Sequence, residues 1–465
     1  MPIDPSLLLL ASEPHDVSLG VTLTFTGILV ALIVSLALEE KIHAKKSVIV
    51  MTFALGSLFL GTALGLLPFH RITWGGHEVD LPVFIPSVDW NVIAIILGAS
   101  LFVDVVSKSG LFTWVAIKLT KVSRGDPVKL LWFYGLMTVV FSAVLNNVTA
   151  MIIVGSLTAV SLSKLGREDK LLGFLLIEGL LTNVGGLLTL ISSVPNIIVG
   201  TAAGISFVDF FLAASPFVAV GTVLTILMGA RLFDIKRLAS DAERRRAKEL
   251  VSSFDENDGI ESRAFFWFGA TMTGLFVIVI ASASHLPVIK DLGMGYVALL
   301  FAGIMILRFK SVADRFYQAI DWDLLAFFAA LFVTINVMER ALVLDLIGEG
   351  LHAIIGLGDT SGTAALLVSS AVFSSVTDNI PLAAMLAKIL GAMDPAPSSS
   401  LWWAVIFGAN LGGNLTPIGS ASTLVAVTIM HKHGLKMSFG AFVKYALPYA
   451  AAQIALATGY VLLFL

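Results

Sequence analysis

The feature that most constrains this chain is a series of long apolar segments that recurs along almost its whole length. They cover residues 18–38, 47–67, 90–117, 206–230, 264–283, 294–308, 322–343 and 440–465. A helix needs about 20 mostly apolar residues to cross a bilayer, and these segments meet or approach that length. Charged residues make up only 13% of the chain, whereas about 25% is usual in soluble proteins. The sequence therefore predicts an all-α polytopic membrane protein and excludes a soluble enzyme, a disordered chain and a nucleic-acid binder.

Sequence motifs of catalysis and of ATP-driven transport are absent from the chain. It contains no Cys, no glycine-rich phosphate-binding loop and no cluster of His and carboxylate residues with metal-ligand spacing. No paired nucleophile and base stands out either. We therefore expect no enzymatic activity, no cofactor beyond a coupling Na⁺ or H⁺, and no nucleic-acid partner.

The uneven distribution of Lys and Arg among the loops predicts the orientation in the membrane. Basic residues are concentrated in 39–46, 118–129, 162–170, 231–263, 308–316 and 431–437. The remaining loops, 68–87, 284–293, 344–362 and 392–400, hold only Arg71 and Lys290. If the basic loops are cytoplasmic, both termini lie outside a plasma (inner) membrane and the linker 231–263 lies in the cytoplasm.

Two apolar segments differ from the others because polar residues interrupt them at their middle. Segment 128–162 contains Asn146-Asn147, and segment 363–391 contains Asp378-Asn379. Each arm is about 15 residues long, which is short for a full crossing, and the two flanks of each segment belong to the same side. We therefore predict two re-entrant hairpins, the first entering from the cytoplasm and the second from outside. Such backbone is tolerated at depth only within protein or beside a watery cavity.

The two halves of the chain repeat each other in three ordered blocks at a nearly constant offset. The matching blocks are Val88–Trp90 with Ile320–Trp322, Ser142–Asn147 with Ser374–Asn379, and Asn183–Ser193 with Asn410–Ser420. We assign 1–230 and 264–465 to two repeats, joined by the cytoplasmic linker. Each has five spans, one hairpin and one broken helix, at 171–204 and 401–430. An odd number of spans inverts the second repeat, as in many secondary transporters.

Polar residues cluster at the two hairpin tips and at the two helix breaks, where membrane depth makes them costly. Unwound carbonyls with Asn, Ser and Thr oxygens suit a hard cation such as Na⁺, and helix N-termini suit an anion. Asp378 is the main titratable candidate, with Glu178 and Asp104 as secondary ones. Any single Gly or Ser has close helix packing as its alternative role. The candidate ion-binding residues are Asn146, Asn147, Thr149, Asn183, Gly185, Gly186, Thr189, Ser192, Ser193, Asn196, Asp378, Asn379, Asn410, Gly412, Gly413, Asn414, Thr416, Gly419 and Ser420.

These motifs resemble those of the ion transporter superfamily, which includes P-protein-like permeases, arsenite permeases, NhaD-type sodium/proton antiporters and divalent-anion/sodium symporters. Leu145–Thr149 and Asp378–Pro381 resemble its hairpin tips, and Gly185–Asn196 and Gly412–Gly419 resemble its unwound helices. Two carboxylates common in the superfamily are missing, one of them at Asn146 and the other in the first break. The resemblance implies a homodimer, an elevator-like moving domain, and coupling to a cation or proton.

We interpret the chain as a secondary active ion transporter that works in the lipid bilayer by alternating access, with Na⁺/H⁺ antiport as the first hypothesis. The four clusters offer no Lys or Arg, which favours a cation, a neutral substrate, or an anion held by helix dipoles and bound sodium. Arsenite or metalloid efflux and sodium-coupled transport of a carboxylate or other small anion stay open. An ion channel is the alternative of another class, but oppositely inserted hairpins favour alternating access.

Overall fold

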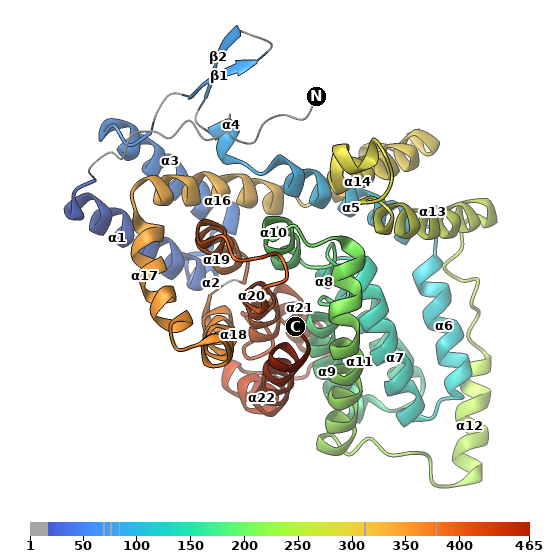
Figure 1. Ribbon diagram of the computed structural model, residues 1–465. Coiled ribbons are helices and arrows are strands. Elements are labelled where there is room, and N and C mark those ends of the chain that lie inside the picture. Colours follow the sequence, from blue (N-terminus) through green and yellow to red (C-terminus); the bar gives the residue numbers. More distant parts are fainter. Residues whose placement is uncertain (1–16, 68–69, 75–76, 83, 311–312, 378) are drawn as a thin grey trace. The chain divides into compact units, whose positions relative to one another are not determined.

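The computed structural model describes residues 17–67, 70–74, 77–82, 84–310, 313–377 and 379–465 (Figure 1). These residues are mainly helical, which confirms the predicted all-α membrane class. Among them, ten helices are long and apolar enough to cross a membrane. They are α1 (Leu19–Ala37), α3 (Lys46–Ala63), α5 (Trp90–Ser107), α7 (Pro127–Val144), α8 (Asn147–Lys164), α11 (Phe207–Leu232), α13 (Arg263–Ala281), α14 (Ile289–Arg308), α16 (Trp322–Arg340) and α22 (Phe439–Phe464).

The shorter elements connect these spans or form the interrupted segments. The helices among them are α2 (Glu39–Ile42), α4 (Phe84–Ser87), α6 (Leu111–Ser123), η2 (Glu168–Lys170), α9 (Leu171–Gly185), α10 (Val194–Ala202), α12 (Asp241–Ser252), α15 (Ala313–Ala319), α17 (Val343–Ile355), α18 (Asp359–Val376), α19 (Asn379–Met393), α20 (Ser400–Gly412) and α21 (Ala421–Lys432). The strands β1 (His70–Trp74) and β2 (His77–Leu81) pair antiparallel. This small β-hairpin was not predicted from the sequence.

One segment predicted as a single span, 90–117, is divided into two helices. In 90–117, α5 ends at Ser107 and α6 begins after Gly110, whose φ of 81° is the left-handed conformation that glycine adopts without strain. The predicted span 322–343 corresponds to the single helix α16, which ends at Arg340, and α17 begins after Leu342 at the end of this segment. In 90–117, the polar residues Ser107, Lys108 and Ser109 before Gly110 mark the turn, but long apolar stretches on both sides of them gave the whole segment the length of a span.

Three of the four hairpin arms are longer than the sequence predicts, and the fourth, α19, has the expected 15 residues. Both arms of the first hairpin, α7 and α8, have 18 residues, as does α18 in the second. At about 1.5 Å per residue an 18-residue helix is roughly 27 Å long, close to the apolar thickness of a bilayer. Re-entry of the hairpins from opposite sides therefore stays a prediction.

The chain separates into two compact units that do not follow the two sequence halves. One consists of the described residues of Met1–Asp89 together with Ala326–Gly350. In this unit α1 packs against α3, and the Gly61 backbone lies close to Leu67 and Val337. The other unit consists of Trp90–Leu325 and Leu351–Leu465 and contains both hairpins and both broken helices.

Within the larger unit, corresponding elements of the two halves make corresponding contacts. The first hairpin packs against α9, and the second packs against α20. The second part of each broken helix packs against the other hairpin, α10 on α19 and α21 on α8. The long helices α11 and α22 cover α9 and α20 and contact each other. Each half therefore completes the packing of the other half's hairpin.

Helix boundaries extend the repeat beyond the sequence blocks that reveal it. The two ends of α22 follow the two ends of α11 at the same offset that relates Trp90 to Trp322. Each of these helices carries one internal proline, Pro216 in α11 and Pro448 in α22, again at this offset. The bounds of α7 and α18 are related in the same way. The inversion of one half relative to the membrane stays a prediction.

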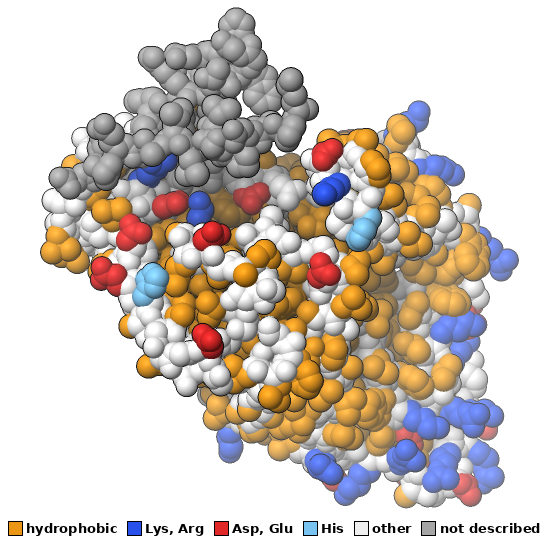
Figure 2. All heavy atoms as spheres, in the orientation of Figure 1, with side chains coloured by type: hydrophobic (Ala, Val, Ile, Leu, Met, Phe, Trp, Pro, Cys, Tyr) orange, Lys and Arg blue, Asp and Glu red, His pale blue; other side chains and the backbone are white. Residues whose placement is uncertain are grey.

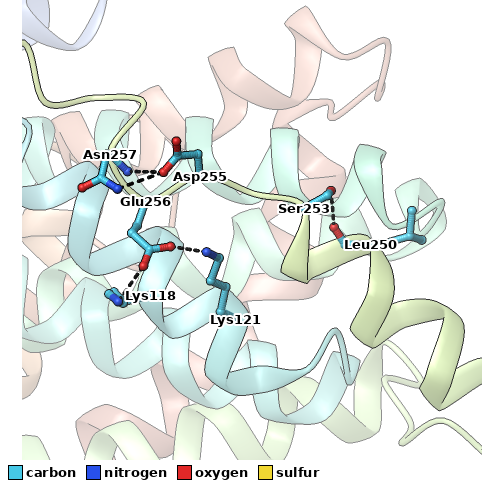
Figure 3. A network of polar contacts seen from close by, with 7 residues as sticks. All are labelled: Lys118, Lys121, Leu250, Ser253, Asp255, Glu256 and Asn257. Atoms are coloured by element: carbon cyan, nitrogen blue, oxygen red, sulfur yellow. Dashed lines mark hydrogen bonds and ion pairs between the residues drawn. The ribbon is translucent and has the colours of Figure 1, made fainter.

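The linker packs against the ends of α6, α7 and α8. Glu256 accepts hydrogen bonds from the ammonium groups of Lys118, at 2.7 Å, and Lys121 (Figure 3). These two lysines lower the pKa of the Glu256 carboxyl from 4.5 to about 2. Nearby, Lys164 at the end of α8 lies 4.5 Å from the centre of the Phe254 ring. Figure 2 shows Lys and Arg side chains gathered where α12 lies, on a face that is otherwise largely hydrophobic.

Candidate ion-binding site at the two helix breaks

Each broken helix stops at a glycine pair and restarts after a serine. The first break separates α9, which ends at Gly185, from α10, which begins at Val194. The second separates α20, which ends at Gly412, from α21, which begins at Ala421. Residues 186–193 and 413–420 are therefore the unwound segments, within the intervals that the sequence predicts.

Gly185 and Gly412 bring each broken helix against the first arm of its hairpin. A Cβ atom added at Gly185 would lie 2.7 Å from the Cα atom of Val139 in α7, and one at Gly412 would lie 2.8 Å from the Cα atom of Ala371 in α18. Both distances are shorter than a carbon–carbon contact allows. Gly185 and Gly412 therefore allow close helix packing, which is the alternative to a role in ion binding. Gly186 has a different neighbour, because an added Cβ would lie 2.7 Å from the side-chain amide of Asn147.

Asn183 and Asn410 occupy equivalent positions in the two halves, and each binds the opposite break. The Ser420 hydroxyl donates to Asn183 Oδ1 at 2.9 Å, and the Ser193 hydroxyl donates to Asn410 Oδ1 at 2.7 Å. Both asparagines are buried. The two bonds are equivalent because the same sequence offset relates Asn183 to Asn410 and Ser193 to Ser420. The breaks therefore form one network that joins the halves.

The remaining amide groups extend this network within and between the halves. Asn183 donates to Asn414 Oδ1 at 2.9 Å, and Asn410 donates to Asn196 Oδ1 at 2.8 Å. Asn196 in turn donates to the carbonyl oxygens of Gly186 and Thr189, at 2.6 and 3.0 Å. The hydroxyl of Ser192, also a predicted site residue, donates to the same two carbonyls.

Threonine hydroxyls attach each break to its own hairpin in the same way. Thr189 donates to the Ala143 carbonyl at 2.7 Å, and Thr416 donates to the Ser375 carbonyl at 2.6 Å. Next to Thr416, Gly419 donates its backbone N–H to the Thr416 hydroxyl at 3.0 Å, and the Gly419 carbonyl approaches Gly413. These contacts hold the second unwound segment in a compact loop.

The first hairpin tip joins the network through Asn147. Its amide donates to Asn183 Oδ1 at 3.3 Å, and its Oδ1 accepts a 2.5 Å hydrogen bond from Ser142. Asn146 is exposed and accepts a bond from the backbone N–H of Thr149 at 2.8 Å, so its side chain caps α8. Such a cap contributes about 1 kcal/mol. Asn147, rather than Asn146, is therefore the tip residue in direct contact with the helix breaks.

The three carboxylates predicted as titratable candidates are not part of the described hydrogen-bond network. Asp378 lies outside the described residues, and Asn379, which follows it, is half-buried at the start of α19. Asp104 forms a 2.6 Å ion pair with Lys108, just after the end of α5, and takes no part in the network. Glu178 is completely buried in α9 and accepts one bond from Thr158.

The network also contains residues outside the list of candidate ion-binding residues. Gln453 in α22 accepts a 2.8 Å bond from Asn414 and donates to Thr225 in α11 at 2.8 Å. Ser422, in the first turn of α21, accepts a 2.8 Å bond from Thr182. An isolated Gln in the apolar segment 440–465 was the signal for the first of these, because a polar amide at membrane depth requires a partner.

Ser193 and Ser420 also determine what the site offers to an ion. Each stands directly before a helix, at the position whose side chain usually caps the first turn. Neither side chain accepts a hydrogen bond from the first turn of its own helix, and each hydroxyl instead donates to an asparagine of the other half. The first turns of α10 and α21 therefore carry backbone N–H groups without a side-chain cap, at the positive ends of the helix dipoles.

The hydrogen-bonded groups of the described network are all amides, hydroxyls and carbonyls. The described residues contain no group of three or more His, Asp or Glu side chains that could hold a metal ion. Carbonyl and hydroxyl oxygens at the breaks suit a weakly held hard cation, and uncapped helix starts suit an anion. The arrangement therefore favours binding by dipoles over binding by fixed charge.

Comparison with known proteins places these features among transporters. A sequence model described as "Citrate transporter" (CitMHS) matches residues 30–408. An uncharacterized transporter of Mycobacterium tuberculosis is 31% identical over 380 residues, which cover 80% of this chain and 86% of that protein. The P protein of Sus scrofa is 25% identical over 95% of this chain and 59% of its own length. The YdaH transporter of Alcanivorax borkumensis, described as having an unusual topology, shares the fold with a TM-score of 0.58 at 15% identity, over 90% of this chain and 98% of YdaH.

Proposed function

Because this chain belongs to the citrate transporter family, within the ion transporter superfamily whose motifs it carries, we propose that it carries a small organic anion by alternating access. The family and the ten apolar helices make it an integral membrane transporter. The cargo, the coupling ion and the mechanism are our proposal. A carboxylate such as citrate is the first substrate to test.

The paired bonds between the two helix breaks are the observation that carries this proposal. Asn183 with Ser420 and Asn410 with Ser193 are equivalent pairs, so neither half dominates the site. A site shared by two similar halves has two arrangements of comparable energy, one for each side of the membrane, as alternating access requires. A channel would instead need a continuous polar path.

The chemistry of the helix starts supports an anion as the cargo. The uncapped first turns of α10 and α21 can donate backbone hydrogen bonds to a carboxylate without a nearby Lys or Arg. The asparagine amides add donors that can rearrange. A bound Na⁺ at the carbonyls of the breaks would compensate the charge of the cargo, so sodium or proton coupling belongs to the same proposal.

Na⁺/H⁺ antiport is the second candidate function. The observation that favours it is the concentration of oxygen atoms at the breaks, where the carbonyls of Gly186 and Thr189 accept several side-chain bonds. A Na⁺ ion could replace those donors, and a carboxyl group would then carry the exchanged proton. For either function, the orientation with both termini outside a plasma membrane is proposed from the distribution of Lys and Arg. The homodimer and the elevator motion are proposed from the resemblance to the superfamily.

Exchange of labelled citrate in proteoliposomes tests the proposed function. Vesicles loaded with unlabelled citrate should take up labelled citrate through the wild-type protein, and Asn183→Ala should reduce this exchange at least tenfold. Vesicles loaded with succinate or sulfate determine the range of anions. Asn257→Ala is the matched control, because this asparagine is exposed in the linker and lies outside the network, and it should retain most of the exchange.

Each part of the proposal, namely the anion as cargo, alternating access and the site at the helix breaks, has an outcome that would contradict it. An absence of exchange with every anion, combined with Na⁺-driven proton movement reported by a pH-sensitive dye, would support the antiporter. Unitary currents in a planar bilayer would support a channel. Equal exchange by Asn183→Ala and wild type would place the cargo away from the helix breaks.

A further inference from the structure

Glu178 is a buried carboxyl group that the polar network does not use. It lies near the middle of α9, before Asn183 on the same helix, and its side chain is fully buried. Oε1 accepts a 2.6 Å bond from the Thr158 hydroxyl of α8, whereas Oε2 has no hydrogen-bond partner among the described residues. A polar atom left without a partner in a dry interior is costly, and a carboxylate charge there costs far more.

The described groups around Glu178 offer it no positive charge. The helices and the short turn that pack against α9 are α7, α8, α11, α20, α21 and η2. Their titratable side chains are Lys129 and Tyr134 on α7, Lys164 on α8, Asp209 and Arg231 on α11, His431 and Lys432 on α21, and Glu168, Asp169 and Lys170 on η2. Except for Tyr134, they lie in a first or last helical turn or precede α9. The Tyr134 hydroxyl is bonded to Thr120 and Ser161, at 2.6 and 2.7 Å.

We infer that Glu178 is the proton-binding residue that couples the movement of the cargo to a pH gradient. This inference rests on the proposed function, since it assigns the coupling site of the same transporter. The carboxyl group is enclosed by α8, α9 and the rest of the larger unit, and none of the described cations pairs with it. A carboxyl group in these surroundings is carried as the neutral acid.

The coupling step is a reversible proton transfer. When α9 faces water on one side of the membrane, the Glu178 carboxylate takes one proton from hydronium or water, and its charge is neutralised. The neutral group can then be buried again, and the same O–H bond breaks on the other side to return the proton to water. The Thr158 hydroxyl, which donates to Oε1, positions the carboxyl group in both protonation states.

Glu178→Gln tests this inference because glutamine keeps the shape of the neutral acid and cannot release a proton. The variant should lose the accumulation of labelled citrate driven by a pH gradient by at least tenfold, and its exchange should become independent of pH. Exchange at equal pH should persist, because no net proton movement is needed. Glu168→Gln, which removes an exposed carboxylate just before α9, is the matched control and should behave as wild type.

Infrared difference spectroscopy between high and low pH gives a readout that needs no substrate. The purified wild type should show a protonated carboxyl C=O band that is missing from Glu178→Gln and present in Glu168→Gln. If wild type transports no anion but shows this band, the proposed cargo is wrong and the proton site stands.

Two results would overturn the assignment of Glu178. One is gradient-driven accumulation in Glu178→Gln equal to wild type, and the other is an unchanged infrared band in this variant. If Glu178→Gln does not fold, Thr158→Val replaces it. This variant removes the hydrogen-bond donor to Oε1 of Glu178, so the pH dependence of its citrate exchange should be shifted relative to wild type. An unshifted profile in Thr158→Val would then contradict the inference.

Discussion

At the scale of single residues, Asn183 and Asn410 connect the two halves of the site. Each accepts a hydrogen bond from a serine hydroxyl of the opposite break and donates a hydrogen bond to a second asparagine. Removal of either asparagine side chain leaves buried hydrogen-bonding groups without their partner, which costs about 1–3 kcal/mol. The site therefore depends on reciprocal bonds whose loss affects both halves.

A double-mutant cycle on Asn183 and Ser420 tests whether this bond joins the halves. We expect each single substitution to alanine to reduce the free energy of unfolding by about 1–3 kcal/mol. The double variant should lose less than the sum, with a coupling of about 0.5–3 kcal/mol because the two groups are direct partners. Thermal unfolding in detergent measures it. Strictly additive losses would mean that the Ser420–Asn183 bond does not stabilise the folded chain.

At the scale of elements, the glycines that end the broken helices set the distance to the hairpins. Gly185→Ala and Gly412→Ala should each destabilise the protein by about 1–3 kcal/mol, because the added methyl group meets the backbone of α7 or α18. Gly221→Ala in α11 is the control, since its added methyl makes contacts of 3.5 Å or more. The control should be neutral or stabilising, because alanine favours helix. Equal melting temperatures for all three variants would contradict the close packing.

The contact between the linker and α6 should depend on the charge of Glu256. The pKa of the Glu256 carboxyl is lowered from 4.5 to about 2 by Lys118 and Lys121. The ionised carboxylate therefore stabilises the contact between the linker and α6. The stabilisation is complete above pH 4.5 and is lost as the pH falls from 4.5 toward 2. A spin label at Ser252→Cys should therefore become more mobile over this range.

Glu256→Gln should give the mobile spectrum already at neutral pH, whereas Glu249→Gln, exposed on α12, should leave the label as in the parent. High salt should act like Glu256→Gln, because it screens a partly exposed ion pair. A label that stays equally immobile in Glu256→Gln would show that apolar contacts such as Phe254 hold the linker without help from charge.

At the scale of the whole molecule, the predicted orientation can be tested directly because the chain contains no Cys. Single cysteines at Val122 and Ser163, which flank the first hairpin, should react with an impermeant thiol reagent from the cytoplasmic side. Cysteines at Ser361 and Ser398, which flank the second hairpin, should react from outside. All four positions are exposed. Labelling of both pairs from one side would refute the inverted arrangement of the two repeats.

Hydropathy and repeats were sufficient to predict the helical membrane class, the family and the place of the helix breaks. Apolar length and the pairing of Asn183 with Asn410 at a fixed offset are properties of the sequence alone. Local chemistry also predicted the interruptions after Gly185 and Gly412, since glycine pairs unwind helices. The turn at Gly110 was missed because the short polar stretch before it, Ser107 to Ser109, lies between two long apolar stretches that together have the length of a span.

The sequence by itself determined that this chain is a duplicated membrane transporter with polar breaks, because burial in a bilayer requires apolar helices and makes every polar residue conspicuous. Only the tertiary structure decided which polar groups meet. It joined Ser193 to Asn410 and Ser420 to Asn183, brought Gln453 into the network, and left Asp104 with Lys108. It also enclosed Glu178 without a cation from the described part of the chain. Hydrogen bonds act over about 3 Å, so partners that lie in opposite halves of the sequence become known only when the helices are packed.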